Sequence, residues 1–201
     1  APQKVCVGDS NTLYVMDGNA VRAYSTQLRS LTTLTGTSSS GSADGSLDGA
    51  TFTGPLSCAY DGMRNLYVVE ITAGRVRRVD LSLAQVSTFA TGLSSPFDVW
   101  HDGNQTLYVT LRTTNAVTTL NTTLVTGTAT ALVSGTPLNS PVGLVGDGLG
   151  NLYVTNTGGF NLVRVAIAPR TMAVVAGSAA GTVNGTSDGT GTGALLRSPW
   201  Y

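Results

Sequence analysis

Apolar and polar residues alternate over four to six positions in many short segments of the chain, and this period of two predicts β-strands rather than helices. The most regular segments are near-copies of one tetrapeptide, TLYV or NLYV, at residues 12–15, 65–68, 106–109 and 151–154. Their leucines lie 53, 41 and 45 residues apart, a period that is typical of propeller blades. The pattern therefore predicts four copies of one structural unit.

Each copy after the first follows a proline, an apolar segment and an Asp-Gly turn, at residues 55–62, 96–103 and 141–148. Asp-Gly between apolar segments is a strong hairpin signal, because glycine accepts the positive φ angle that such turns need. The first copy keeps a shorter version, Gly8-Asp9-Ser10, which lacks one residue. An inner strand is thus expected before every tetrapeptide.

Two further strands are expected after each copy. The third strands are predicted at residues 21–24, 76–79, 117–120 and 162–165, and the fourth at 31–34, 86–90, 129–133 and 172–176. We therefore predict an all-β chain, a β-propeller of four-stranded antiparallel blades. The predicted blades span residues 5–53, 54–95, 96–140 and 141–197, and a fifth repeat begins at residue 198. The repeated Leu, Tyr and Val residues are interpreted as core, because each blade buries its apolar faces against its neighbours.

The repeat unit resembles the NHL-repeat family of β-propellers. The shared pattern is proline, apolar strand, Asp-Gly, Asn-Leu-Tyr-Val, an acidic or amide residue, Val-Arg, and Thr-Leu-x-Gly. Asp17, Glu70 and Asn156 stand at the acidic position of the motif, whereas Leu111 departs from it. The resemblance covers essentially the whole chain. It implies the fold and says little about function, since NHL propellers serve as enzymes, RNA binders, sensors and adhesion modules.

Two long connections share one pattern. Asp44-Gly45 precedes Pro55 by the same spacing that separates Asp188-Gly189 from Pro199, and Trp200-Tyr201 then ends the sequence. Four blades in an arc would leave blade faces and strand edges unpaired. We expect the chain to be part of a longer protein, and the alternatives are closure with blades of another chain in an assembly or a compact four-bladed ring.

The composition points to an extracellular setting. Eleven basic and eleven acidic residues give a formal charge of zero without runs of like charge, which disfavours nucleic acid and direct insertion into a membrane. Thirty Thr and eighteen Ser accompany a single lysine, Lys4. Threonine suits exposed strand positions, and the remaining hydroxyl groups suggest a secreted or cell-surface protein. Among NHL proteins, this character is closest to that of protist surface glycoproteins.

Candidate modification sites fit this setting. Asn104, Asn121 and Asn184 each begin an N-glycosylation sequon, and all three are expected in turns. Cys6 and Cys58 are expected at matching positions of the inner strands of the first two blades, as two buried thiols or as one disulfide near the propeller axis.

Candidate chemistry is sparse. His101 is the single histidine and is expected to be structural, because no serine lies in a nucleophile-elbow context. The acidic loop at residues 41–49 lacks the ligand spacing of a calcium loop, so turn formation is the better account. Arg75, Arg77 and Arg78 are expected at solvated strand positions. We expect no catalytic residue, no metal site and no cofactor.

The leading hypothesis is a non-catalytic extracellular module that acts in adhesion or assembly, including structures associated with a flagellum, through a protein partner or self-assembly. The first alternative is a ligand sensor or lyase-type NHL enzyme whose site at the central channel is completed by further blades. The second is an intracellular scaffold or RNA binder, with free thiols and no sugar.

Overall fold

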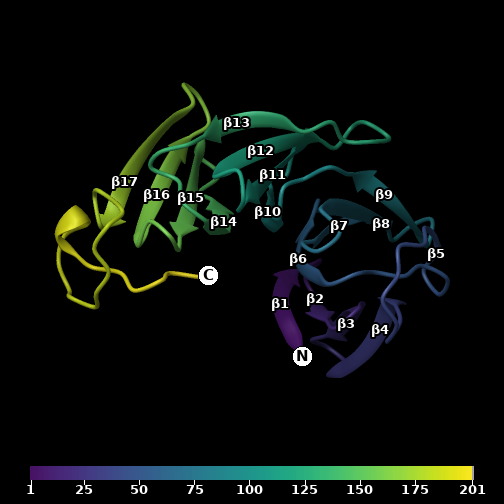
Figure 1. Ribbon diagram of the computed structural model, residues 1–201. Helices are drawn as coiled ribbons and strands as arrows, with labels where there is room; N and C mark the ends of the chain where they lie inside the picture. The colour runs from purple at the N-terminus through teal and green to yellow at the C-terminus, as the bar shows by residue number, and fades with distance from the viewer. Residues whose placement is uncertain (201) are drawn as a thin grey trace.

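A computed structural model describes residues 1–200, and Tyr201 lies outside the described residues. The strands form four antiparallel sheets that follow one another round an open arc (Figure 1). The first sheet contains β1 (Pro2–Val7), β2 (Thr12–Asp17), β3 (Ala20–Ser25) and β4 (Ser30–Gly36). The second contains β6 (Pro55–Tyr60), β7 (Asn65–Glu70), β8 (Arg75–Asp80), β9 (Gln85–Ala90) and a short outer strand, β5 (Gly45–Ser46).

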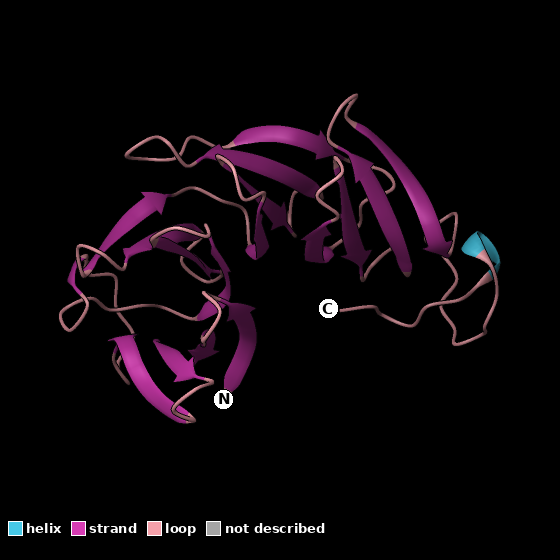
Figure 2. Cartoon of the chain, turned by 180° about the vertical axis from the view of Figure 1, so that it is seen from behind, coloured by secondary structure: helices cyan, strands magenta, loops and turns pink. Residues whose placement is uncertain are grey.

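The third sheet contains β10 (Pro96–His101), β11 (Thr106–Leu111), β12 (Ala116–Asn121) and β13 (Thr130–Ser134). The fourth contains β14 (Pro141–Gly146), β15 (Asn151–Asn156), β16 (Asn161–Ala166) and β17 (Thr171–Gly177). One short 3-10 turn, η1 (Gly191–Gly193), is the only helical element in residues 1–200 (Figure 2). None of the described helical structure is long and apolar enough to cross a bilayer.

The predicted β-propeller of four antiparallel blades is confirmed. Each tetrapeptide lies in the second strand of its sheet, and the inner strands β1, β6, β10 and β14 lie side by side round the axis. We refer to the sheets as blades one to four. The predicted strand positions are correct to within one or two residues, and only β5 was not expected.

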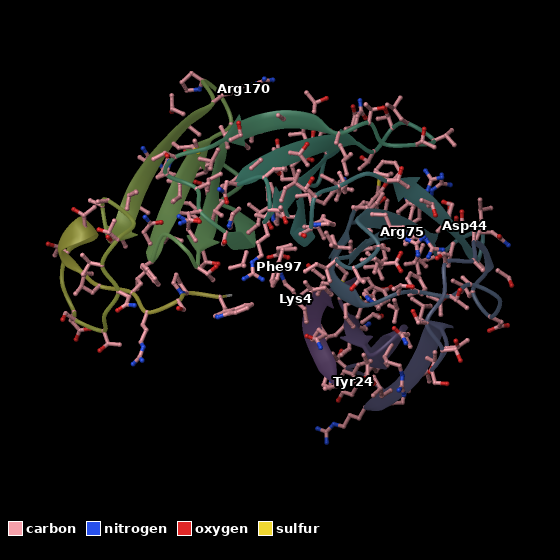
Figure 3. The ribbon with its side chains drawn as sticks, in the orientation of Figure 1. Lys4, Tyr24, Asp44, Arg75, Phe97 and Arg170 are labelled. Carbon is pink, nitrogen blue, oxygen red and sulfur yellow. A yellow bond between two sulfur atoms is a disulfide. The ribbon has the colours of Figure 1, made fainter. Side chains whose placement is uncertain are left out.

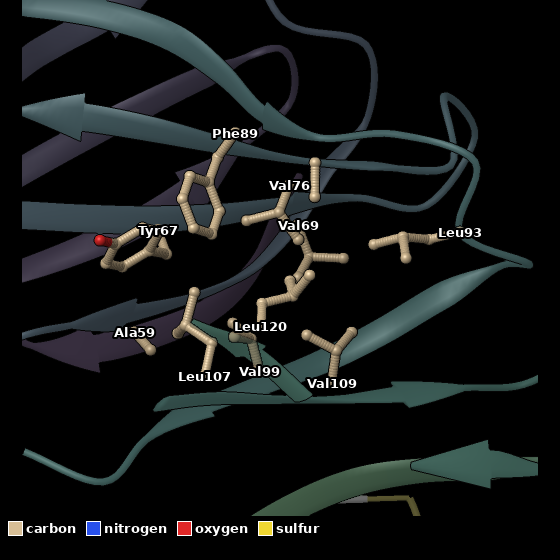
Figure 4. Packing of buried hydrophobic residues seen from close by; sticks show 11 residues of the cluster. Ala59, Tyr67, Val69, Val76, Phe89, Leu93, Val99, Leu107, Val109 and Leu120 are labelled. Atoms are coloured by element: carbon tan, nitrogen blue, oxygen red, sulfur yellow. The ribbon is translucent and has the colours of Figure 1, made fainter. Parts of the chain in front are cut away.

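The core lies between blades, as the repeat predicted. Leu66, Leu107 and Leu152 of the repeated tetrapeptide are completely buried. Between blades two and three, Tyr67 packs edge-on against Phe89, with 5.1 Å between ring centroids, and the side chains of Val69, Val99 and Leu107 join the same cluster (Figure 4). The tetrapeptide recurs because every second strand faces a neighbouring blade.

Candidate functional site

A cavity of about 580 Å³ opens at the centre of the arc, where the inner strands of all four blades meet. Its lining is mostly apolar, with aromatic rings and the side chains of one lysine, one aspartate and one histidine among the apolar groups. The residues that matter for the chemistry are Lys4, Tyr60, Asp98, Trp100, His101 and Tyr153. An apolar cavity with a few convergent polar groups is the usual form of a small-molecule site.

Asp98 on β10 is the polar centre of this cavity, and its side chain is completely buried. The carboxylate accepts hydrogen bonds from Lys4 Nζ on blade one and from Ser57 Oγ on blade two. Its other oxygen accepts from the backbone N–H of Leu144 on blade four, at 2.8 Å. One carboxylate therefore joins the inner strands of all four blades, and its acceptor capacity is used in holding them together.

Asp98 is not part of the repeated motif, but the sequence carries a signal for it. In each inner strand, one residue pairs with the valine of the tetrapeptide in the neighbouring strand. The residue directly before it is equivalent in the four blades, and it is Lys4, Ser57, Asp98 or Gly143. A lysine and an aspartate at the same position of different repeats predict an ion pair at the axis, provided that the propeller is known. Figure 3 shows Lys4 on the inner, concave side of the arc.

His101 is buried at the rim of the cavity, with 8% of its surface exposed. Its ring is stacked on Tyr67, with 6.1 Å between centroids, and Nδ1 accepts a hydrogen bond from the backbone N–H of Gly103 at 3.1 Å. Burial lowers the pKa of His101 below its usual value, although the charges of Asp102 and Asp61 oppose this. The imidazole thus supports the turn that follows β10.

The Asp-Gly turns form a row of loops after the inner strands. The carboxylate of Asp61 accepts hydrogen bonds from the backbone N–H groups of Met63, Arg64 and Asn65. Burial opposes ionisation of Asp61, but these bonds prevail and lower its pKa. Asp147 repeats the arrangement in blade four, where the side chain and backbone of Asn151 lower its pKa. These aspartates fix turns, as expected of Asp-Gly.

The arginine cluster differs from expectation. Arg77 is completely buried, and Arg75 has only 11% of its side chain exposed, so the prediction of solvated positions is wrong for both. Arg75 and Arg77 both form ion pairs with the fully buried Glu70. Arg78, on the other face of β8, lies over Phe89 with 5.8 Å to the ring centroid. Burial follows from the long connection before blade two, which covers this face of β8.

That connection is anchored by Asp44. Its carboxylate forms an ion pair with Arg77 at 2.7 Å and accepts hydrogen bonds from the N–H and hydroxyl of Thr88, each at 3.0 Å. Desolvation opposes ionisation, but the Thr88 bonds and the Arg77 charge prevail and lower the pKa of Asp44. The aspartate of the acidic loop thus serves to hold the loop on the blade. Within residues 1–200, no three His, Cys, Asp or Glu side chains gather as metal ligands.

Cys6 and Cys58 are joined in a disulfide between blades one and two, with 5.9 Å between the Cα atoms. The ladders correct one detail of the prediction. Cys6 lies opposite Tyr14, whereas Cys58 lies opposite Val68, so the two cysteines are one position apart in the repeat. The first turn is not shorter than the others, because Val7 pairs with Leu13 over the same spacing as Tyr60 with Leu66. Asp9 instead stands one residue nearer to the tetrapeptide than Asp61 does, so an alignment on the aspartates displaces Cys6 by one position.

All three sequon asparagines are exposed. Asn104 lies in the turn between β10 and β11, and Asn184 follows β17. Asn121 is the last residue of β12 rather than part of a turn, and its Oδ1 accepts hydrogen bonds from Thr123. Asn104 and Asn121 border one surface hollow on blade three. Each asparagine is accessible to an attached glycan.

Comparison with solved structures supports the propeller fold. An auxiliary nutrient binding protein from Bacteroides ovatus aligns with a TM-score of 0.71 and 12% identity, over 98% of this chain and 52% of that one. Inactive virginiamycin B lyase from Staphylococcus aureus, solved with quinupristin, aligns with a TM-score of 0.66 and 15% identity. The alignment covers 87% of this chain and 55% of the lyase. A chain of a nidogen/laminin complex aligns with a TM-score of 0.63 and 16% identity, over 83% of this chain and 61% of that one. No family model and no curated protein sequence matches the chain.

At these identities the likeness shows the fold alone. The chain spans roughly half to three fifths of the length of these three propellers. They include an enzyme, a binding protein and a complex between proteins, so the shared architecture does not select one activity.

Proposed function

We propose that the chain is a non-catalytic interaction module of a secreted or cell-surface glycoprotein. It would bind a protein partner or further copies of itself through blade edges and loop faces, in adhesion or in building an extracellular structure such as one associated with a flagellum. The observation that carries this proposal is the exposed end of the arc. On blade one, Val5, Val7 and Leu31 are 50%, 70% and 49% exposed. Contiguous apolar surface of this kind marks sites of protein interaction.

Two further observations support the proposal. The polar groups at the axis are bonded to one another through Asp98, which leaves the blade ends and the loops as the larger accessible surfaces. The accessible sequon asparagines and the single disulfide suit an oxidising, glycosylating compartment. The nidogen/laminin structure provides a precedent for a propeller that takes part in a complex between proteins.

The extracellular setting is tested by intact mass spectrometry of the chain secreted from eukaryotic cells. We expect a mass above 20.5 kDa that falls on treatment with N-glycosidase, and a gain of two hydrogen atoms when a reductant cleaves the disulfide. Single Asn→Gln variants at positions 104, 121 and 184 assign each glycan. An unmodified mass with two free thiols would remove the basis for a secreted module.

The interaction role is tested by binding of the secreted chain to immobilised extracellular proteins and to itself. Leu31→Asp should weaken binding at the blade-one end by about tenfold or more, because it places a charge in an apolar contact at a residue outside the central cavity. Leu83→Asp is the matched control, since Leu83 is 65% exposed at an outer turn away from this end. Equal binding by both variants, or no binding by the wild type, would argue against the proposal.

The central cavity supports the alternative of a ligand sensor or lyase-type enzyme. Its volume and its aromatic lining by Tyr60, Trp100 and Tyr153 suit an apolar small molecule. Val145→Trp should fill the cavity from its rim, whereas Val183→Trp changes an exposed residue outside it. A thermal shift with a small-molecule library, quinupristin included, that is lost only in Val145→Trp would favour this second function.

A further inference from the structure

The segment after β17 folds like the connection between blades one and two, although no described blade follows it. We call residues 41–53 the first connector and residues 185–197 the last connector. Backbone hydrogen bonds recur at matching places, Gly41 N to Phe52 O and Thr51 N to Ala43 O in the first connector, and Gly185 N to Leu196 O and Leu195 N to Ser187 O in the last. The last connector therefore already has the shape that docks on a blade.

Residues beyond the last connector continue this likeness. The Thr155 hydroxyl donates a hydrogen bond to the carbonyl of Trp200, just as the Thr110 hydroxyl donates to the carbonyl of Val142 on the inner strand of blade four. Trp200 thus lies where the inner strand of a following blade would begin.

The first connector shows what such a segment binds. Asp44 contacts Arg77 and Thr88, which are ladder partners on β8 and β9. Phe52 is completely buried beneath the Arg77 guanidinium, and its ring centroid lies 4.9 Å from Arg77 Cζ. A receiving blade therefore offers an arginine on its third strand, a threonine opposite on its fourth, and a carboxylate at the end of its second strand for the incoming backbone.

Blade one has all three groups of a receiving blade. Arg22 on β3 is the ladder partner of Thr33 on β4, the same register as Arg77 and Thr88. Asp17 ends β2 at the place of Glu70 and forms an ion pair with Arg22 at 3.6 Å. These side chains border a hollow of about 400 Å³, whereas on blade two the connector fills the equivalent region.

The exposure of equivalent residues shows that blade one is uncovered. Leu31 is 49% exposed, whereas Val86 at the same ladder position of blade two is 2% exposed beneath the connector. Blades three and four have Thr118 and Val163 at the arginine position, and short connections precede them. Within residues 1–200, the chain thus has one undocked connector and one uncovered receiving face of matching charge.

We propose that the last connector of one copy docks on blade one of a second copy, with Asp188 of the first copy bound to Arg22 and Thr33 of the second. Leu196 would pack as Phe52 does, between the donor's blade four and the arginine of the receiver. This inference rests on the proposed interaction function and names its partner. Because donor and receiver faces differ, the interface is head-to-tail and produces either a closed ring or a filament.

Docking requires one local rearrangement. In blade two, the first connector leads into Pro55, which lies opposite Glu70. In blade one, Pro2 already holds the equivalent place opposite Asp17. The start of β1 in the receiver and residues 198–200 of the donor would therefore occupy the same place. Trp200 is 49% exposed and contacts Phe97 and Arg112 at its ring. Its displacement gives up these ring contacts and the hydrogen bonds that its carbonyl accepts from Thr155 and Gly143, and the β1 strand of the receiver takes its place.

Sedimentation velocity over a range of protein concentrations tests the proposal. The wild type should associate, and Asp188→Arg or Arg22→Asp alone should weaken association about 100-fold or more, because each places like charges opposite one another. An equimolar mixture of these two variants should associate again, since each chain then supplies the group that the other needs. Recovery in the mixture also shows that both variants fold.

Asp48→Arg and Arg170→Asp are matched charge reversals at exposed positions outside the interface, and they should associate like the wild type. Wild-type protein that stays monomeric at all concentrations would overturn the inference, as would single variants that associate normally or a mixture that does not recover. If binding to other extracellular proteins through blade one persists in that case, the proposed function stands and only the identity of the partner is wrong.

Discussion

The two connectors of this chain have the same local conformation and very different surroundings. In the first connector, Ala50 and Phe52 are completely buried against blade two. In the last, the matching Ala194 and Leu196 are only half-buried, although the backbone hydrogen bonds are the same. Turn chemistry and short-range hydrogen bonds are therefore enough to shape a connector, and a receiving blade decides how much stability it contributes.

The largest expected effect comes from removing the buried arginine. Arg77→Met should lower the free energy of unfolding by about 3–5 kcal/mol, because Asp44, Glu70 and two connector carbonyls lose their common donor. The matched Arg22→Met should cost less than ~1 kcal/mol in the dilute protein, where its face is uncovered. Urea unfolding of both variants measures the difference, and equal losses would mean that burial of the arginine has no bearing on its contribution.

A somewhat smaller effect is expected at the apolar anchor of each connector. Phe52→Ala should destabilise the chain by about 3–4 kcal/mol, since it leaves a cavity between blades one and two. Leu196→Ala should change the free energy of unfolding by less than ~1 kcal/mol when no second copy is bound. Thermal unfolding at low protein concentration tests this pair. A large loss in Leu196→Ala alone would mean that the last connector is already docked within its own chain.

The smallest expected effect is a dependence on pH. The pKa of Asp44 is lowered in the folded protein, so its contribution is complete above the unfolded-state value near 4 and is lost as pH falls through the folded pKa. Asp44→Asn should therefore reduce the loss of stability between about pH 4 and pH 2. Asp188→Asn is the control and should leave the acid-unfolding profile close to that of the wild type. Identical profiles for Asp44→Asn and the wild type would contradict the assigned role.

Much of the fold could be predicted because the repeat states it four times. Alternation, the Asp-Gly turns and the recurring Leu-Tyr-Val residues fixed strand positions and the propeller architecture. The matching spacing of the two connectors also appeared in the sequence, from Asp44 to Pro55 and from Asp188 to Pro199. These signals are local, so they do not depend on which blades meet.

The candidate sites were less predictable, because they join residues far apart in the chain. Strand periodicity placed Arg77 on an outer strand but could not show that a connector 33 residues earlier covers it. The position of Cys6 was wrong by one residue, since the first repeat has its aspartate one residue later in a turn of the same length. The role of Asp98 could not be predicted from local patterns, because its partners come from three other blades.

By itself, the sequence determined the blades, their strands, the turns and the conformation of both connectors, since these follow from side-chain periodicity and hydrogen bonds between near neighbours. Only the tertiary structure decided which charges are buried, which cysteines meet and which blade face lacks a cover. The physical reason is that burial depends on what packs against a surface, and in a propeller each surface is covered by the neighbouring blade or by the segment that leads into it.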